Sequence, residues 1–560
     1  MESAAHHFIC IRELYDLLLA QLSLEENASD KTDRVSIARL ARASRLTSGP
    51  ALDVLWSKVT RPSQIMRLFP EDALQLAGMF GGEYTLLRRL KESDFVAFDK
   101  YAPRVYFVDF SKSFTGLGAG CEFLSTIRKH RNPIFPHLRS FEWHPTTRFN
   151  TVGAFHLISR EHNVPRDDFA LTMWGNISSR DAGPRYPAPE FFTGAGLAET
   201  IDSFRSPLSS WLPDVPSLSI NTGNYLAKPV LLQGLESLSK LQHFYARASG
   251  SLGAEILDHL ALLPNLKTLH IGDEDEKSIS LLSDSVRRRE LTTGSASFPA
   301  LESVEIYGPY LALTTFVTLI TSQFLHTVCL NITDAHPIDS SIFFELTAPP
   351  GRSSTLRHFA FYTQDHAVAD HERRAVFSIS SFEPLLGCRN LETLDINFDA
   401  YKVEFDDADL EKMANAWPRL ETLKVFSRYT QQFCWADPQV HLYTLWSLVE
   451  KCRNIRRIEM PVDARVCSQF VPPRYSSQIR PAAPGSFSME KIGFFLSPCG
   501  SPAHVAAFLN FAFPHLIEFF AGPPKNDGTC RTQTWAQVRE ALPGVDRMWR
   551  ALRLAHATPC

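Results

Sequence analysis

The glycine-rich segment Gly116–Gly120 (GLGAG) is the part of the chain that most resembles a cofactor-binding motif. It follows the strand-like run VYFVDF and precedes a predicted helix, and Glu142 ends the next strand-like run, an order typical of a dinucleotide-binding fold. The third glycine of G-x-G-x-x-G would fall on Cys121, and Ser111–Thr115 place too many residues between strand and loop for a tight phosphate turn. We therefore interpret the segment as an ordinary connection and predict no cofactor.

Two histidines, His366 and His371, lie beside Asp365 and Asp370, and side chains of these types can bind a metal ion. The histidines do not form an H-x-x-x-H pair with a partner glutamate, and the surrounding stretch is polar. A metal site needs three or four converging ligands. We therefore interpret this stretch as a solvated loop and predict no metal site.

The ten cysteines are scattered along the chain and never form a C-x-x-C pair, which is typical of reduced, mostly buried thiols. Cys388 and Cys452 each begin a strong copy of a recurring phrase described below, which indicates small buried residues and not catalytic thiols. The sequence also lacks a GxxxxGK[ST] loop, a nucleophile elbow, a kinase signature and paired catalytic carboxylates. We predict no catalytic residues and no enzymatic activity.

The composition favours a large folded protein without a global preference for polyanions. The chain has 560 residues, of which 44% are hydrophobic and 21% are charged, so it carries enough apolar surface to exclude a mainly disordered protein. Its 57 basic and 61 acidic residues leave a formal net charge of -4, which does not steer it towards nucleic acid or anionic lipid. With no signal-peptide-like start and no apolar run of ~18 residues, we expect no membrane partner, no nucleic-acid partner, and a cytoplasmic and/or nuclear location.

One phrase recurs along the chain: an apolar residue, two variable residues, then two apolar residues separated by a single variable one. The clearest copies are LPNLKTLHI, FPALESVEI, CRNLETLDI, WPRLETLKV and CRNIRRIEM. Counting weaker copies, the first apolar positions are Val105, Leu138, Val215, Leu241, Leu266, Leu301, Leu325, Leu356, Leu391, Leu420, Ile455, Ile492 and Leu516. Apart from one gap of 77 residues, the intervals cluster between 24 and 37 residues.

The phrase predicts a short strand, because alternation sends its apolar pair to one side and the intervening residues to the other. Segments with helical spacing lie between the copies, so each unit is a strand followed by a helix. Such units bury their apolar faces only when stacked, which predicts an α/β solenoid with a curved parallel sheet and convex helices. We expect the long gap to hide an irregular unit with a strand at Phe169–Trp174, followed by a loop insertion near residues 175–198.

The amino-terminal part reads differently, with three runs of apolar residues at helical spacing. Asp33 and Asp53 lie near the expected starts of the second and third helices. The runs contain Ile11, Leu14, Leu17, Leu18 and Leu22, then Val35, Ile37, Leu40 and Ala41, then Leu52, Leu55, Trp56 and Val59. We predict a small three-helix module in residues 8–60.

The recurring phrase resembles the leucine-rich repeat, and its uneven units resemble the degenerate repeats of fungal proteins that carry an F-box. The front segments IRELYDLLLAQL and RVSIARLARASRLTSGPALDVLWSKV resemble the F-box of basidiomycete-type proteins, above all in the ending ALDVLW at Ala51–Trp56. This resemblance implies that the module binds the Skp-type adaptor of a cullin-RING ubiquitin ligase, while the repeats hold a protein substrate. Two positions depart from the family pattern: Arg12 stands where the family usually has proline, and Thr47 stands where it often has tryptophan.

By that resemblance, one set of residues would form the core and the adaptor-binding surface of the module: Ile11, Leu14, Leu17, Leu18, Leu40, Ala43, Leu55 and Trp56. Strand alternation predicts a second set on the concave face of the solenoid, where they would contact the substrate: His243, Tyr245, His270, Glu305, His358, Asp395, Lys424, Arg457 and Glu459. This mixture of aromatic, acidic and basic groups suits a protein partner and poorly suits a duplex phosphate track.

We expect four parts: the F-box-like helical module in 8–60, a helical connector or cap in 61–103, the irregular leucine-rich-repeat-like solenoid in 104–521, and a carboxy-terminal cap or tail in 522–560. Two interpretations of function follow. In the first, the protein is the substrate-recognition subunit of a Skp/cullin/F-box type ubiquitin ligase. In the second, it is a leucine-rich-repeat interaction scaffold without ligase recruitment, and its front helices only cover the first apolar face of the array.

Overall fold

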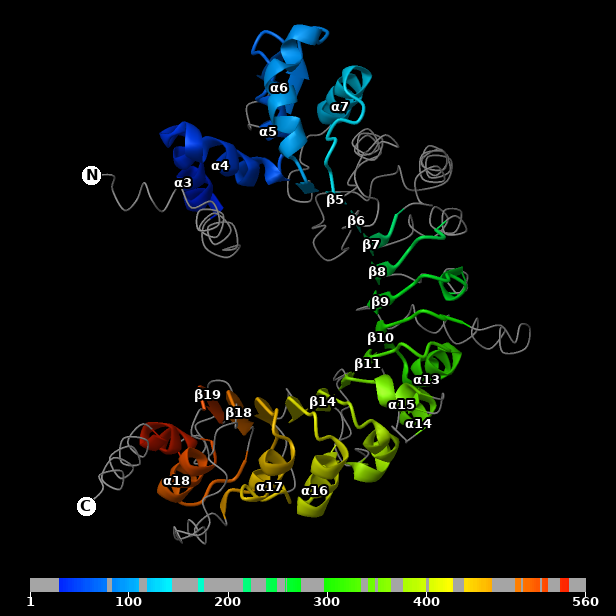
Figure 1. The fold of residues 1–560 in the computed structure, drawn as a ribbon, viewed down its shortest axis with the longest axis vertical. Helices are drawn as coiled ribbons and strands as arrows, with labels where there is room; N and C mark the ends of the chain where they lie inside the picture. Colours follow the sequence, from blue (N-terminus) through cyan, green and yellow to red (C-terminus); the bar gives the residue numbers. More distant parts are fainter. Residues whose placement is uncertain are drawn as a thin grey trace, which may run out of the picture. The chain divides into compact units, whose positions relative to one another are not determined.

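A computed structural model of the full chain divides into two compact units, residues 1–265 and 266–560. Figure 1 shows the elements of both units. The structure describes residues 30–77, 83–109, 118–143, 170–175, 215–222, 238–248, 257, 259–272, 297–333, 341–347, 351–363, 376–398, 402–426, 438–465, 489–494, 497–513, 516–521 and 534–542.

Unit 1 contains a parallel sheet whose strands pair in chain order. A separate antiparallel pair of strands comes from the segment of sequence that connects the first two strands of this sheet. The parallel strands are β1 (Lys58–Val59), β4 (Phe107–Asp109), β5 (Ser140–Trp143), β6 (Ala170–Gly175), β7 (Ser217–Thr222) and β8 (His243–Ala248). β6 pairs with β5 on one side and β7 on the other, which confirms the strand expected at Phe169–Trp174 inside the long gap.

The described front helices of unit 1 are α3 (Asp30–Ala43) and α4 (Arg45–Ser57), which pack against each other across the single connecting residue Ser44. Helix α4 begins earlier than expected because the Ser44 hydroxyl accepts a hydrogen bond from the Thr47 amide at 3.2 Å and caps the helix. Asp53 therefore lies inside α4, and the prediction that it marks the helix start is wrong. Helix α4 passes directly into β1, so Val59 is a buried strand residue and not part of a helix.

The stretch between β1 and β4 contains helical turns, as expected, and also a strand pair that the sequence pattern did not indicate. The pair is β2 (Leu74–Ala77) and β3 (Glu83–Leu86), and helix α7 (Gly118–His130) packs against β3. The helical elements are α5 (Pro62–Met66), η1 (Glu92–Phe95), α6 (Val96–Tyr101) and η2 (Ala102–Arg104). Four or fewer residues per strand give too short an alternation to predict β2 and β3 from the sequence.

An aromatic cluster forms the core beneath these elements. The rings of Phe69 and Phe95 lie 5.2 Å apart and those of Phe69 and Phe123 lie 5.1 Å apart, both edge to face, and all three side chains are buried. Beside them, the buried carboxylate of Asp94 accepts hydrogen bonds from the Arg88 guanidinium, the nearer at 2.6 Å, and these lower the pKa of Asp94 to about 2. The region is therefore a packed part of unit 1 and not an extended linker.

Unit 2 contains a longer parallel sheet, and its strands also pair in chain order. The strands are β9 (Thr268–Gly272), β10 (Ser303–Gly308), β11 (Thr327–Ile332), β12 (His358–Thr363), β14 (Thr393–Phe398), β16 (Thr422–Phe426), β17 (Arg457–Glu459), β18 (Lys491–Phe494) and β19 (Glu518–Ala521). This all-parallel topology confirms the predicted α/β leucine-rich-repeat-like solenoid.

The recurring phrase accounts for the core of unit 2. In the copy around β14, the three apolar side chains of Leu391, Leu394 and Ile396 are fully buried. One position in the predicted series is wrong: Ile492 pairs in register with Ile458 and so occupies the second apolar position of its repeat. The first position belongs to Met489, which is buried but lies in a serine-rich stretch where the phrase is not apparent.

Helices of unit 2 lie on the apolar side of its sheet, which leaves the opposite side to the intervening residues (Figure 1). They are α13 (Tyr310–Leu319), α14 (Ser341–Thr347), α15 (Arg352–Thr355), η7 (Ile379–Gly387), α16 (Asp407–Ala416), α17 (Thr444–Lys451) and α18 (Pro502–Ala512). We call the side of the sheet away from these helices the polar face. It corresponds to the concave face predicted from strand alternation.

A second line of parallel pairing links consecutive repeats of unit 2 ahead of their helices. It contains the pair β13 (Val376–Ser378) and β15 (Lys402–Glu404), followed by the bridges between Asp406 and Gln439, His441 and Asp463, and Ala464 and Cys499. Gly500 is needed beside the last bridge, because a Cβ atom there would lie 2.6 Å from the Arg465 carbonyl oxygen.

The end of unit 2 is covered by a helical segment, residues 534–542. Trp535 is buried against Phe494 of β18 and Phe519 of β19, with ring centroids 5.5 and 5.8 Å apart, and its indole N–H donates to the Ser497 carbonyl at 2.7 Å. Val538 on the same segment is also buried. These contacts cover the last two strands, as expected for the end of a solenoid.

Arg352 is a fully buried charge that joins two helix ends. Its guanidinium donates to the Leu346 carbonyl in the last turn of α14, at 3.2 Å, and to the carbonyl of Ile320, the residue that ends α13. Helix carboxyl ends carry carbonyls without internal partners and favour cations. Burial lowers the pKa of Arg352 to about 10, so the side chain remains charged at neutral pH.

We predict that Arg352→Ala lowers the free energy of unfolding by about 2–4 kcal/mol, because it opens a cavity and leaves two buried carbonyls without donors. Arg357→Ala is the matched control, since Arg357 is 56% exposed and makes only a 3.7 Å ion pair with Glu392; its cost should be about 0.5 kcal/mol or less. Urea unfolding of both variants provides the measurement. Equal midpoints for the two variants would contradict the assigned role of Arg352.

Candidate partner-binding surfaces

The two front helices close around a small apolar core. Ile37 of α3 and Ala51 of α4 are buried at its centre, and Leu40 and Leu55 pack against them while remaining half-buried. The Arg34 guanidinium donates to the Leu55 carbonyl at 3.1 Å and ties the two helices together at a second point. The contact confirms the helical spacing predicted for both segments.

The side chain of Thr47 links the two helices of this hairpin by a hydrogen bond. Its side chain is 1% exposed, and its hydroxyl donates to the Leu40 carbonyl at the end of α3 at 2.7 Å. The larger indole of the tryptophan that the resemblance would place here could not keep the hydroxyl bond to Leu40 in this buried position. The departure at Thr47 is thus part of how this chain closes its hairpin, and a lone threonine gave no sequence signal for that role.

The structure places the predicted adaptor-binding residues in different surroundings. Leu40 and Leu55 meet in the hairpin core, Ala43 is exposed at the end of α3, and the Trp56 ring stacks on Tyr101 with centroids 4.7 Å apart. Four predicted residues lie outside the described part of the chain: Ile11, Leu14, Leu17 and Leu18. The hairpin also exposes two apolar side chains: Val35, which belongs to the predicted apolar run and is 46% exposed, and Leu46, which the sequence pattern did not single out and which is 62% exposed.

The predicted concave-face residues of unit 2 fall into rows, because equivalent residues of neighbouring strands pair in a single register. We call the row formed by the second intervening residue of each strand the middle row. From β9 to β17 it contains His270, Glu305, Cys329, Ala360, Asp395, Lys424 and Glu459. His358 and Arg457 belong to the neighbouring row at the start of the strands. The register therefore brings together the unit 2 residues predicted for substrate contact.

Many charged side chains of the polar face pair with one another. The His270 Nδ1 atom lies 2.8 Å from a Glu305 oxygen, Lys424 forms an ion pair with Asp395, and Arg457 donates to Glu459. Asp395 and Glu459 are consequently only 6% and 4% exposed, although they lie on the side away from the helices. Pairing makes their burial tolerable, across neighbouring strands for Asp395 and within β17 for Glu459.

The other two predicted concave-face residues belong to β8 of unit 1. His243 and Tyr245 pair in register with Ser217 and Ser219 of β7. Tyr245 is 38% exposed and His243 is half-buried. Both lie on the side of the strand opposite the buried Phe244, as alternation predicted.

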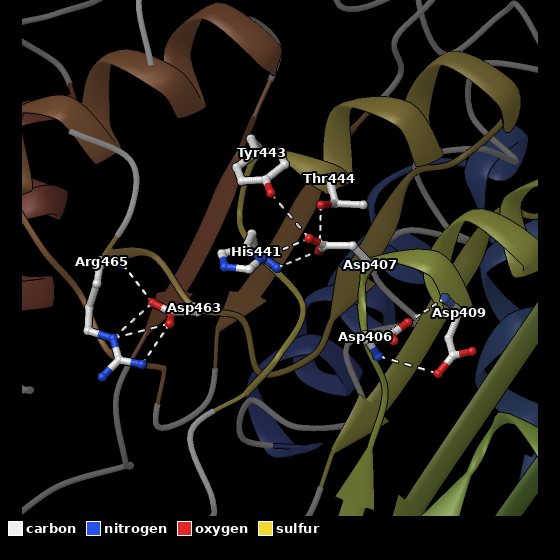
Figure 2. A network of polar contacts seen from close by, with 8 residues as sticks. All are labelled: Asp406, Asp407, Asp409, His441, Tyr443, Thr444, Asp463 and Arg465. Carbon is white, nitrogen blue, oxygen red and sulfur yellow. Dashed lines mark hydrogen bonds and ion pairs between the residues drawn. The ribbon is translucent and has the colours of Figure 1, made fainter. Parts of the chain in front are cut away.

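A network of polar contacts joins two consecutive repeats beside α16 (Figure 2). The carboxylate of Asp407, the first residue of α16, accepts hydrogen bonds from the Thr444 hydroxyl at 2.6 Å, from the His441 amide at 2.8 Å, and from the His441 Nδ1–H at 2.7 Å. Burial would raise the pKa of Asp407, but the bonds from Thr444 and His441 outweigh it and lower the pKa below its usual value. In the next repeat, Asp463 accepts from the Arg465 amide at 2.8 Å.

The pairing of a carboxylate with Nδ1 of a histidine is also found in nucleophilic catalytic sites. Within the described part of the chain, no serine, threonine or cysteine side chain is hydrogen-bonded to His441, and the Thr444 hydroxyl bonds to Asp407 instead. All donors to Asp407 come from the following repeat. The network therefore acts as a connection between repeats.

Two other candidate chemistries can be placed in the structure. Cys388 and Cys452 are fully buried, and burial raises the pKa of each thiol to about 12, which confirms them as buried protonated residues. The glycine-rich segment is described from Gly118 onwards, where it begins α7 between β4 and β5. His366 and His371 lie outside the described residues, and within the described ones no group of three or more His, Cys, Asp or Glu side chains is arranged to hold a metal ion.

Among the described residues, no helix has the length and the apolar run required to cross a bilayer.

No protein-family model matches the sequence, and no curated protein matches it significantly. Among solved structures, the chain is similar to one from the crystal structure of the Rad7 and Elc1 complex in yeast, with 13% identity, coverage of 74% of this chain and 88% of that chain, and a TM-score of 0.29. The parallel topology itself defines the class, an α/β protein with a leucine-rich-repeat-like solenoid.

We predict that Asp407→Asn lowers the free energy of unfolding at pH 7 by about 1–3 kcal/mol, because an amide cannot accept all the donors that the carboxylate accepts. The folded-state pKa of Asp407 lies below the ordinary value of 3.8. Its contribution is therefore fully present above about pH 4 and is lost as the pH falls through the folded pKa. Urea unfolding from pH 7 down to pH 3 should show the difference between wild type and variant shrinking.

Glu411→Gln provides the control on the same helix, since the Glu411 side chain is 58% exposed and pairs only with Lys451 at 2.8 Å. Its effect should be about 0.5 kcal/mol or less at every pH. The assignment fails if Asp407→Asn is no more destabilising than Glu411→Gln at neutral pH, or if the stability difference grows on acidification.

Proposed function

We propose that the protein is the substrate-recognition subunit of a Skp/cullin/F-box type ubiquitin ligase. Its N-terminal helices would bind the Skp-type adaptor, and the polar face of its repeats would bind a protein substrate. The observation that carries this proposal is the α3–α4 hairpin. Its core contains Leu40 and Leu55, as the F-box resemblance implies, and it exposes the apolar side chains of Val35 and Leu46.

The polar face supports the second half of the proposal. Charged, hydroxyl and aromatic side chains alternate along it, and exposed aromatic groups such as Phe520, which is 44% exposed beneath the Lys491 ammonium, add apolar contact area. Protein interfaces favour aromatic and arginine anchors within a polar surround. A face that carries Glu305, Asp395 and Glu459 in one row does not follow the phosphate track of a nucleic acid.

In this function the chain itself performs no bond chemistry. One surface holds the adaptor and another holds the substrate, so ubiquitin transfer by the rest of the ligase gains from a raised effective concentration. Within each unit, the continuous parallel pairing holds neighbouring repeats in a fixed register.

The scaffold without ligase recruitment is the alternative, and a specific observation favours it. Helix α4 runs directly into β1, which pairs with β4 at the first edge of the unit 1 sheet. Arg104 from η2 bonds to the Gly49 carbonyl at 3.1 Å and pairs with Asp53, so α4 is held against the sheet region. Such contacts are typical of helices that cover the first apolar face of a repeat array. Helices with that role do not need to bind an adaptor.

We predict that the protein co-purifies with a Skp-type adaptor and that Leu46→Asp weakens this binding by about thirtyfold or more, as loss of a hot spot worth about 2 kcal/mol requires. The double variant Leu14→Asp with Leu17→Asp should have the same effect, because the resemblance places both residues in the module. The measurement is co-expression followed by affinity purification and quantification of the bound adaptor.

Leu311→Asp is the matched control. Leu311 is 53% exposed on α13 in unit 2, so the substitution introduces the same charge at a similar exposure outside the module. It should leave adaptor binding unchanged. A wild-type protein that does not retain the adaptor would favour the scaffold. Equal retention by all variants would contradict the assignment of the hairpin as the adaptor-binding surface.

A further inference from the structure

One stretch of the middle row lacks the ion pairs found elsewhere in that row. On β11 and β12 the row contains Cys329 and Ala360, whose side chains are short and uncharged, and they are flanked in register by Glu305 on β10 and Asp395 on β14. With neighbouring strands about 4.8 Å apart, the two carboxylate-bearing residues are roughly 14 Å apart. We call Cys329 and Ala360 the floor of this stretch.

Aromatic residues follow the floor in the next row along the strands. Tyr307, Asn331, Tyr362 and Asn397 pair in register from β10 to β14, so a tyrosine lies beside each side of Asn331. Tyr307 donates a hydrogen bond to Glu305 at 3.2 Å, which places its ring next to that carboxylate. Carboxylates combined with aromatic rings favour a cation, through charge and through the negative ring faces.

Two buried oxygen atoms at this place have no hydrogen-bond donor among the described residues. Lys424 pairs with one oxygen of Asp395, and the other, Oδ1, has no partner. The Oδ1 atom of Asn397, two residues along the same strand, also has none. The residues are 6% and 3% exposed, and a buried acceptor without a donor costs about 1–3 kcal/mol. An N–H donor brought to either oxygen would remove this cost.

The charge balance of the surrounding face has the same sign. From β10 to β14, the strands together with the residue just before each strand contain the carboxylates of Glu302, Glu305, Glu392 and Asp395, against the single guanidinium of Arg357. Lys424 and Lys267, just outside this range, pair with Asp395 and Glu302, so the four carboxylates face three cationic side chains and the balance is -1 with the histidines neutral. Burial raises the pKa of the floor thiol Cys329 to about 12, and Glu305 and Asp395 contribute to this increase, so the field of both carboxylates reaches the floor.

We propose that the floor, Cys329 and Ala360 between Glu305 and Asp395, binds an arginine side chain presented by the protein substrate. This inference rests on the proposed use of the polar face and adds the chemical class of the group recognised. The guanidinium lies over Ala360 and donates to Asp395 and Asn397 on the neighbouring strand, while Tyr362 contacts its plane and Glu305, two strands away, adds longer-range attraction. Arginine fits better than lysine because its planar fork can donate to two acceptors at once.

The test is a fluorescence-anisotropy titration of the full chain with a labelled heptapeptide that has two arginines separated by glycine. The same peptide with citrulline in place of arginine keeps the shape and removes the charge. We expect the arginine peptide to bind about tenfold or more tightly than the citrulline peptide, as a charge-assisted hydrogen bond requires. Binding should weaken as the salt concentration rises.

Two variants locate the binding site. Glu305→Gln combined with Asp395→Asn removes both flanking charges, and Ala360→Phe fills the floor without changing any charge. Each should weaken arginine-peptide binding by about tenfold or more. Glu411→Gln, on an exposed side chain of α16, is the control and should bind like wild type. If the charge variant does not fold, as judged by its thermal melting, Ala360→Phe and the citrulline peptide decide.

The inference is overturned if the two peptides bind equally, if neither binds up to about 1 mM, or if a folded charge variant or Ala360→Phe binds the arginine peptide like wild type. These outcomes are separate from the fate of the proposed ligase function. Adaptor retention is measured by co-purification and depends on the hairpin, whereas arginine binding is measured on unit 2 residues. Failure of one experiment leaves the other result standing.

Discussion

Parallel pairing in a single register is the constraint on which the rest of each unit depends. When Ser303 pairs with Thr327 and Thr327 with His358, every later residue of those strands is fixed in its row. The apolar positions then form continuous buried rows, and the intervening positions form rows on the polar face. A shift by one residue would exchange the two, so the buried leucines and isoleucines hold the polar rows in place.

The same register allows charges to be buried on an otherwise exposed side of the sheet. Asp395 can pair with Lys424 because their strands are neighbours. Glu459 can pair with Arg457 because residues two apart on one strand lie on the same face. Outside the strands the pattern continues, as Lys267 pairs with Glu302 at 3.6 Å and Arg357 with Glu392 at 3.7 Å. Each pair contributes little stability by itself, but together the rows of pairs favour contact between particular neighbouring repeats.

The elements that the sequence predicted are those encoded within one repeat. The phrase around Leu391 or Leu301 contains its own alternation, and each copy proved to be a strand of the parallel sheet. Contacts between distant segments were not predictable in this way. The Arg352 guanidinium reaches a carbonyl 32 residues away, and Asp407 bonds to donors 34 to 37 residues away. No local pattern marks such partners.

The side of the sheet on which the candidate residues lie was predictable to the same degree. Alternation placed the nine concave-face residues on the correct side of their strands, because side-chain direction follows from period two. It could not show which of them would pair with each other, since that depends on which strands are neighbours. Alternation also did not indicate a role for Cys329 and Ala360, because the significance of a small uncharged residue depends on which carboxylates lie beside it on neighbouring strands.

Internal pairing decides where on the polar face a partner gains most. A cation that approaches Glu459 must displace Arg457, and the cost of separating a nearly buried ion pair offsets the new contact. A cation at the floor displaces no charged side chain of the middle row, because Cys329 and Ala360 carry none. It also gives donors to oxygen atoms that have none among the described residues. In the proposed mode of binding, the preferred position of a cation therefore follows from where the rows of charge are interrupted, more than from how many charges they contain.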